Sequence, residues 1–218
     1  MCIGLNRFFS KTNNFGKIRF KKDIIMDAAQ LEKQLFTEAR THRSFTSKEI
    51  DDSILHKIYE LAKFGPTANN ACPMRLTFVK SPEAKQKLIE VASEGNRPKI
   101  KSSPVTVILA YDIDYYKQIP LLAPHMDAAK IEAQPEEERD KFARELSWLQ
   151  AGYVIIAARH LGLDCGAMSG FDRAGTDDAF YLGTSWRSNI LINLGYGDNE
   201  TLRERAPRLD FDDACQFL

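Results

Sequence analysis

The stretch Gly65-Pro66-Thr67-Ala68-Asn69-Asn70-Ala71-Cys72-Pro73 is the part of the sequence that most decides the fold. It follows a helical pattern of apolar residues from Ile50 to Leu61 and precedes the strand-like run Arg75–Val79. Small and amide side chains between a helix and a strand leave room for a planar ligand and offer it hydrogen-bond donors and acceptors. The stretch therefore predicts a ligand-binding loop at a helix–strand junction.

The composition sets the broad class of the protein. A chain of 218 residues with 44% hydrophobic residues can bury the core of one ordinary domain. The formal net charge is zero, which gives no sign of a nucleic-acid partner. No apolar run approaches the roughly 20 residues that a membrane-spanning helix needs, so we expect no membrane partner.

The cysteines argue against a metal site. Cys2, Cys72, Cys165 and Cys215 form no C-x-x-C pair, and the sequence contains no H-E-x-x-H spacing. Four free thiols are typical of a reducing compartment, so the sequence predicts a cytoplasmic protein without a metal.

Periodicity and capping signals predict the main elements. Helices are expected over residues 27–39, 46–64, 81–92 and 135–161, and strands over residues 75–79, 104–111 and 190–195. Thr46 or Ser47 is the expected cap of the second helix. Residues 112–134 are expected to be irregular. Since residues 104–111 are apolar on both faces, they should lie in the middle of the sheet of one α+β domain.

The segment Trp148–Ala158 of the last predicted helix is nearly all apolar. A helix that is apolar on every side is buried on every side. Burial by a second subunit is one way to achieve this, and a position in the core is the other.

Four segments, in order along the chain, resemble those of the nitroreductase family of FMN-dependent oxidoreductases. They are Arg40-Thr41-His42-Arg43, the 65–73 stretch, Ala167-Met168-Ser169-Gly170-Phe171 and Arg205-Ala206-Pro207-Arg208. The resemblance runs from about Leu31 to Leu218. It implies a nitroreductase-like α+β fold with a central mixed or antiparallel sheet flanked by helices. It also implies non-covalent FMN, NADH or NADPH as reductant, and a homodimer with the flavin at the subunit interface.

Further sequence segments resemble one branch of this family, which contains the malonic semialdehyde reductase of pyrimidine degradation. These are Met168–Arg173, Asp177–Phe180 and Leu191–Asp198. The branch implies reduction of malonic semialdehyde to 3-hydroxypropionate. A broad reductase of nitro compounds, quinones or enones is the alternative enzyme, and a flavin-binding protein without turnover is the alternative of a different class.

The resemblance assigns the cofactor-binding residues. They are Arg40, Thr41, Arg43, Arg205 and Arg208 for the phosphate, Pro66, Thr67 and Asn70 in the loop, and Ser169 and Gly170 for a backbone N–H directed at flavin N5. Arginine forks match phosphate oxygens, although each arginine is alternatively a solvated surface charge. Asn70 is alternatively a turn residue, and Ser169-Gly170 a simple turn.

The chain departs from the family at two places. Cys72-Pro73-Met74 stands where many members carry Gln-Pro-Trp, and Ser169 stands where they carry glutamate. The first change predicts an altered pocket above the flavin. The second need not abolish function, because a backbone donor does not depend on the side chain.

No residue is certain to be catalytic, because the flavin carries out hydride transfer. His125 is the candidate proton donor, with a surface-loop histidine as the alternative. Arg75 is the candidate for a substrate carboxylate, with a salt bridge at the sheet edge as the alternative. Cys72 lies in the flavin loop, yet hydride transfer needs no thiol. The sequence leaves open the physiological acceptor and the choice between NADH and NADPH.

Residues 1–25 differ from the rest of the chain. They carry several lysines and arginines and no acidic residue before Asp23. We expect a disordered extension, or translation from Met26, with a basic transit peptide as the alternative. The FMN-binding domain is then expected over residues 26–218.

Overall fold

The computed structural model describes residues 27–218, and the predicted extension over residues 1–25 lies outside them. The strands are β1 (Met74–Val79), β2 (Val105–Asp112), β3 (Asp164–Met168) and β4 (Trp186–Gly195). The α-helices are α1 (Ala28–Glu32), α2 (Asp52–Ala62), α3 (Pro82–Val91), α4 (Arg97–Ser102), α5 (Ile119–Leu122), α6 (Ala128–Glu132), α7 (Glu136–His160), α8 (Arg173–Phe180) and α9 (Phe211–Ala214). A π-helical turn, Lys33–Thr37, continues α1.

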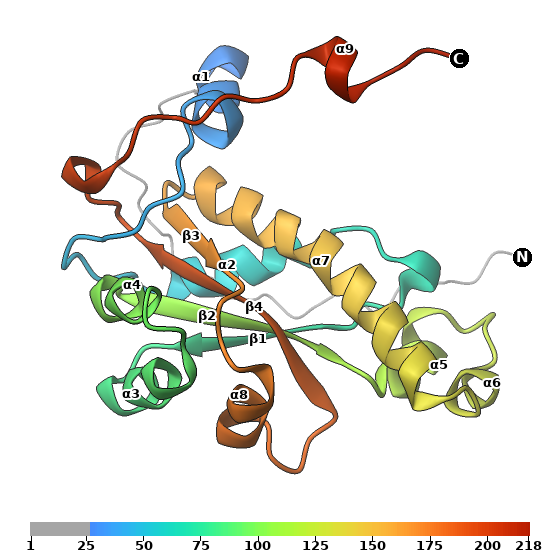
Figure 1. The fold of residues 1–218 in the computed structure, drawn as a ribbon. Helices are drawn as coiled ribbons and strands as arrows, with labels where there is room; N and C mark the ends of the chain where they lie inside the picture. The colour runs from blue at the N-terminus through green and yellow to red at the C-terminus, as the bar shows by residue number, and fades with distance from the viewer. Residues whose placement is uncertain (1–26) are drawn as a thin grey trace, which may run out of the picture.

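The described strands form one antiparallel sheet with the order β1-β2-β4-β3 (Figure 1). Every residue of β2 is buried, which confirms that residues 104–111 lie in the middle of the sheet. The α+β class predicted from the sequence is confirmed.

Helices cover both faces of the sheet. Val107 and Leu109 of β2 pack on one face against α2 and α7, in a cluster that also contains Ile58 and Val154. The alternate residue Ile108 points to the opposite face, in a cluster with residues of α3 and α4. This alternation follows from the two-residue period of a strand, and it explains why β2 is apolar throughout.

One helix boundary and one strand illustrate how the structure differs from the sequence prediction. The second helix begins at Asp52 rather than near Thr46, because the Asp51 side chain caps it by accepting from the Ser53 N–H at 2.8 Å. Ile50 is buried in an extended segment before the helix. Strand β3 was not predicted, because five residues that include Gly166 and no β-branched residue carry little strand signal.

The segment 112–134 was predicted to be irregular, and this is wrong. It contains a 3-10 helix, Tyr115–Gln118, followed by α5 and α6. Its apolar residues, such as Tyr115 and Ile119, pack with Ala143 near the start of α7. These helices have four or five residues each, which is too short to give a periodic pattern.

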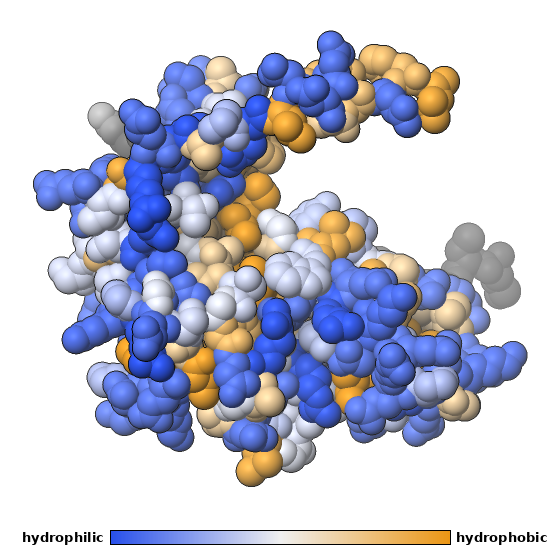
Figure 2. Space-filling model, viewed as in Figure 1, coloured by the Kyte–Doolittle hydropathy of each residue, from blue (hydrophilic) through white to orange (hydrophobic). Residues whose placement is uncertain are grey.

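Part of one helix face and the C-terminal segment are exposed. On α7, the predicted apolar stripe buries Ala151 and Val154 but leaves Trp148, Leu149 and Tyr153 40–49% exposed. The C-terminal segment, residues 203–218, is exposed along its whole length and runs away from the body of the protein (Figure 1). We call it the C-terminal arm. Figure 2 shows hydrophobic residues gathered towards its end.

Within residues 27–218, none of the helices is both long and apolar enough to cross a membrane.

Candidate functional site

Six arginines line one cavity of about 590 Å³. They are Arg40, Arg43, Arg159, Arg203, Arg205 and Arg208. We call them the arginine cluster. Glu204 is the single acidic residue among the lining residues, and within the described chain none of the six forms an ion pair with a carboxylate. Such uncompensated guanidinium groups suit a phosphate dianion.

Residues 40–43 are held in place by strand β3. Thr41 bridges to Cys165 in parallel, and the His42 N–H donates to the Cys165 carbonyl at 3.0 Å. The buried His42 side chain lies 3.3 Å from Asp164. Gly197 packs so closely that a Cβ there would lie 2.0 Å from His42 Nδ1. The arginine-bearing segment is therefore fixed to the sheet.

The C-terminal arm is tied to the same segment by arginine–carbonyl bonds. Arg40 donates to the Arg203 carbonyl, and Arg205 donates to the Ala39 carbonyl at 2.9 Å. The structure thus brings the two predicted arginine segments together from opposite ends of the chain. Binding of a phosphate by Arg40, Arg43, Arg205 and Arg208 stays a prediction.

Ser169 and Gly170 directly follow β3, the strand that holds residues 41 and 42. A Cβ at Gly170 would lie 2.8 Å from both Asn96 Nδ2 and Ser93 Oγ. A side chain at position 170 would force Asn96 or Ser93 to move, so glycine allows the turn to pack closely against these two residues.

The loop with Pro66, Thr67 and Asn70 lies at a different cavity. The Asn70 amide donates to the Leu122 carbonyl at 2.8 Å, which ties the loop to α5. Asn69, Asn70 and Cys72 have φ angles of 57°, 50° and 44°. Three non-glycine residues at positive φ in one short loop store strain, and such strain clusters at ligand sites. Within one chain, the structure does not bring Asn70 to the arginine cluster: the two line separate cavities.

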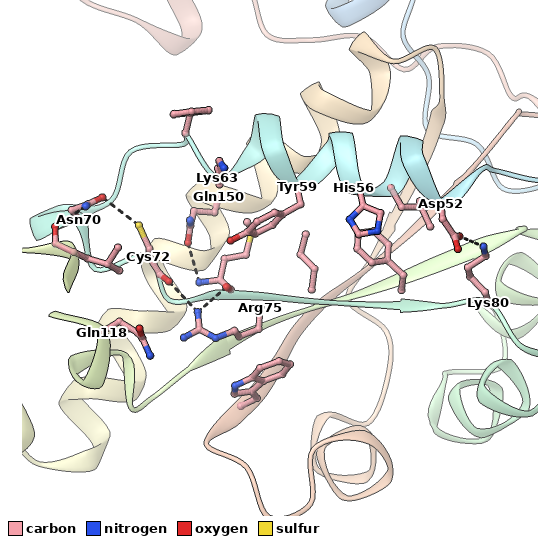
Figure 3. A pocket seen from close by; sticks show the side chains of 17 residues that line it. Asp52, His56, Tyr59, Lys63, Asn70, Cys72, Arg75, Lys80, Gln118 and Gln150 are labelled. Carbon is pink, nitrogen blue, oxygen red and sulfur yellow. Dashed lines mark hydrogen bonds and ion pairs between the residues drawn. The ribbon is translucent and has the colours of Figure 1, made fainter. Parts of the chain in front are cut away.

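Asn70 lines a groove of about 930 Å³ between α2 and β1 (Figure 3). We call it the α2–β1 groove. Its strongly basic side chains already have partners: Lys63 lies 2.7 Å from Glu60, Arg75 lies 2.8 Å from Asp112, and Lys80 pairs with Asp52. The groove therefore has little free positive charge.

Arg75 forms the sheet salt bridge that was the alternative to a substrate role. Its Nη2 donates to Asp112, and its Nη1 donates to the Cys72 and Met74 carbonyls at 3.1 and 2.9 Å. It still lines the groove, so its substrate role stays a prediction (Figure 3). His125 is exposed in the turn between α5 and α6 and lines neither cavity, which favours the surface-loop alternative.

Thiol and metal chemistry find no support in residues 27–218. Cys72, Cys165 and Cys215 are free, and burial raises the pKa of Cys165 to about 12. No group of three or more potential metal-ligating side chains occurs in this part of the chain. Cys2 lies outside the described residues.

Sequence reasoning missed two members of the arginine cluster. Arg203 lies two residues before Arg205, and the density of arginines in this segment was a usable signal. Arg159 is brought in from the end of α7, where it donates to the Leu35 carbonyl at 2.9 Å. Only the packing of α7 against the π-helical turn reveals that position.

Comparisons with known proteins identify the family. The model described as "Nitroreductase family" matches residues 37–196. A protein of Stutzerimonas stutzeri, provisionally named NADH dehydrogenase/NAD(P)H nitroreductase, is 54% identical over 182 residues, which are 83% of this chain and 92% of that protein. The chain belongs to the nitroreductase family. The predictions of this family and of an oxidoreductase enzyme are confirmed.

Solved structures agree on the fold. A provisionally named nitroreductase in complex with FMN from Exiguobacterium sibiricum is 18% identical, with a TM-score of 0.73 over 88% of this chain and 97% of that one. CLA-ER, an enone reductase of gut-bacterial fatty acid saturation metabolism, is 19% identical, with a TM-score of 0.76 over 89% of this chain and 100% of that one. At this identity the two structures show a shared fold, and the predicted nitroreductase-like architecture is confirmed.

Proposed function

We propose that this protein is an NAD(P)H oxidoreductase whose FMN phosphate binds in the arginine cluster. The cofactors are FMN and NADH or NADPH, as supported by the family and by the name of the Stutzerimonas relative. The observation that carries the proposal is the cavity lined by six arginines that have no carboxylate partner in the part of the chain that the structure describes. A phosphate carrying about two negative charges supplies the compensation that residues 27–218 do not provide.

The residues of the chain bind and orient, and the flavin does the redox chemistry. FMN bound there would supply the hydride-transfer chemistry between a reduced nicotinamide and the oxidised substrate. Arg40, Thr41, Arg43, Arg205 and Arg208 hold the phosphate. The backbone of Ser169-Gly170 would direct an N–H towards the reactive edge of the ring.

The proposed enzyme is a homodimer. Asn70, in the same loop as Pro66 and Thr67, lines a groove separate from the arginine cluster, so this loop would contact the same flavin from a second subunit. The exposed apolar residues of α7 and the C-terminal arm give that subunit a surface to bury. Light scattering at micromolar concentration is expected to give twice the chain mass, and a folded, FMN-bound monomer would contradict the dimer.

The proposed substrate is malonic semialdehyde, reduced to 3-hydroxypropionate in pyrimidine degradation. One support is the resemblance of segments such as Met168–Arg173 to that branch of the family. The other is the altered sequence Cys72-Pro73-Met74, from which Cys72 and Met74 line the groove. A broad reductase of nitro compounds, quinones or enones is the second candidate, and the fold shared with an enone reductase is compatible with it. The free thiols in the described chain support a reducing, cytoplasmic compartment.

The test begins with the visible absorption spectrum of the purified protein. We expect a flavin spectrum that bleaches when NADH or NADPH is added without oxygen. Reoxidation is then compared between malonic semialdehyde, its uncharged aldehyde analogue, a nitroaromatic and an enone. Bleaching without reoxidation by any acceptor would favour the flavin-binding protein without turnover. Colourless protein that does not take up added FMN would contradict the proposal.

A further inference from the structure

A chain of hydrogen bonds joins helix α4 to the backbone of Gly170. The Asn96 amide donates from Nδ2 to the Gly170 carbonyl at 2.9 Å, and the Ser93 N–H donates to the same carbonyl at 3.1 Å. The Lys99 ammonium donates to Asn96 Oδ1 at 2.7 Å. Two donors on one carbonyl fix the peptide group that follows Gly170.

Glycine at position 170 makes this anchoring necessary. Glycine has a wide choice of backbone conformations, and close packing against Asn96 and Ser93 removes that choice. Asn96 is only 8% exposed, so water cannot readily replace its amide on the carbonyl. The Asp172 N–H also donates to the Val91 carbonyl at 2.8 Å, which fixes the far end of the turn.

Lys99 is bonded to Asn96 and also interacts electrostatically with two members of the arginine cluster. Burial lowers the pKa of Lys99, and the positive charges of Arg43 and Arg203 lower it further. The ammonium group is therefore within the electric field of the proposed phosphate site while it holds Asn96. Lys99 of helix α4 thus supports Asn96 and interacts electrostatically with arginines of the proposed phosphate site.

We propose that Asn96, held by Lys99, is a positioning residue that orients the Ser169-Gly170 backbone against the reactive edge of the flavin. This inference rests on the proposed function. Asn96 acts through the Gly170 carbonyl, so its loss should slow hydride transfer more than it weakens FMN binding, which depends on the arginine cluster.

The decisive variant is Asn96→Asp. It keeps the shape of the side chain and an acceptor for Lys99, but it places a carboxylate oxygen against the Gly170 carbonyl. Lys99→Met removes the support of Asn96, and Lys99→Arg restores a donor. Lys101→Met is the matched control, because Lys101 is an exposed lysine of the same helix and forms no part of the hydrogen-bonded chain.

The measurements are the FMN dissociation constant, the visible flavin band and the rate constant of flavin reduction at saturating NADH or NADPH. For Asn96→Asp we expect reduction to slow about tenfold or more, with an altered band and FMN affinity close to wild type. Lys99→Met should lower the rate constant of flavin reduction by a smaller factor, and Lys99→Arg should restore it. Lys101→Met should reduce the flavin as fast as wild type.

An unchanged reduction rate and band in folded Asn96→Asp would overturn the inference, as would a loss confined to FMN affinity or melting temperature. If Asn96→Asp does not fold, the lysine variants decide, and equal reduction rates for Lys99→Met and wild type would overturn it. Failure of the wild type to bind FMN or to bleach would instead overturn the proposed function, and it is seen before any substitution is made.

Discussion

The arginine cluster and the α2–β1 groove both hold several cations, but they differ in what compensates the charge. In the groove, Lys63, Arg75 and Lys80 each pair with a carboxylate of the same chain. In the arginine cluster, none of the six guanidinium groups has such a partner within the described residues. Cations that are already paired stabilise the fold, whereas unpaired cations that converge on a cavity leave their charge for a ligand.

The largest expected effect lies in the groove and concerns stability. Arg75→Ala removes the partner of Asp112, whose side chain is only 12% exposed. Because an uncompensated carboxylate then stays partly buried, we expect the free energy of unfolding to fall by about 3 kcal/mol in urea titrations. The double variant Arg75→Met/Asp112→Asn is the control and should recover most of the loss. A single variant as stable as wild type would show that Arg75 is not a structural cation.

The corresponding change in the arginine cluster should affect binding rather than folding. Arg208 is exposed and, among the described residues, donates only to the neighbouring carbonyls of Ala206 and Pro207. We expect Arg208→Ala to weaken FMN binding by about 1.5–3 kcal/mol, as for loss of a hydrogen bond to a charged group, with an unchanged melting temperature. Arg144→Ala removes an arginine that pairs with Asp140 and serves as the control. Equal FMN affinity in the two variants would contradict the claim that arginines without a carboxylate partner bind FMN while paired arginines do not.

A smaller effect is expected on substrate choice. A substrate carboxylate must compete with Asp112 for Arg75. We therefore expect Arg75→Lys to reduce the kcat/KM preference for malonic semialdehyde over its uncharged aldehyde analogue by less than about tenfold, or 1.4 kcal/mol. Steady-state kinetics with both substrates on both proteins measures it. Complete loss of a strong preference would mean that Asp112 yields Arg75 to the substrate.

The smallest effect is expected from removing residues 1–25. The family match begins at residue 37, and the predicted domain begins at Met26. A chain that starts at Met26 should keep its FMN affinity, its mass in light scattering and its melting temperature. Loss of folding in the shortened chain would show that these residues are structural.

The sequence predicted those features that depend on local pattern or on family segments. The long helix α7, the central strand β2 and the order of the ligand-binding segments all leave such signals. The convergence of Arg40 and Arg43 with Arg205 and Arg208 came from the resemblance, since no local pattern joins the two ends of a chain.

What the sequence did not predict depends on distant partners. Asp112 lies 37 positions from Arg75, so the pairing of Arg75 appears only when β1 and β2 align. The role of Asn96 and Lys99 could not be predicted, because it depends on a hydrogen bond to the Gly170 carbonyl, 74 positions beyond Asn96. The short helices α5 and α6 are fixed by packing against α7 rather than by periodicity.

The central claim is that the arginine cluster binds the phosphate of a flavin. The most direct measurement is titration of the flavin-free protein with FMN and with riboflavin, which lacks the phosphate, in wild type and in Arg43→Ala/Arg205→Ala. We expect wild type to bind FMN at least about tenfold, or 1.4 kcal/mol, more tightly than riboflavin, and the double variant to lose most of that difference. Equal affinity for the two flavins in wild type, or a preference for FMN that survives in the double variant, would contradict the account.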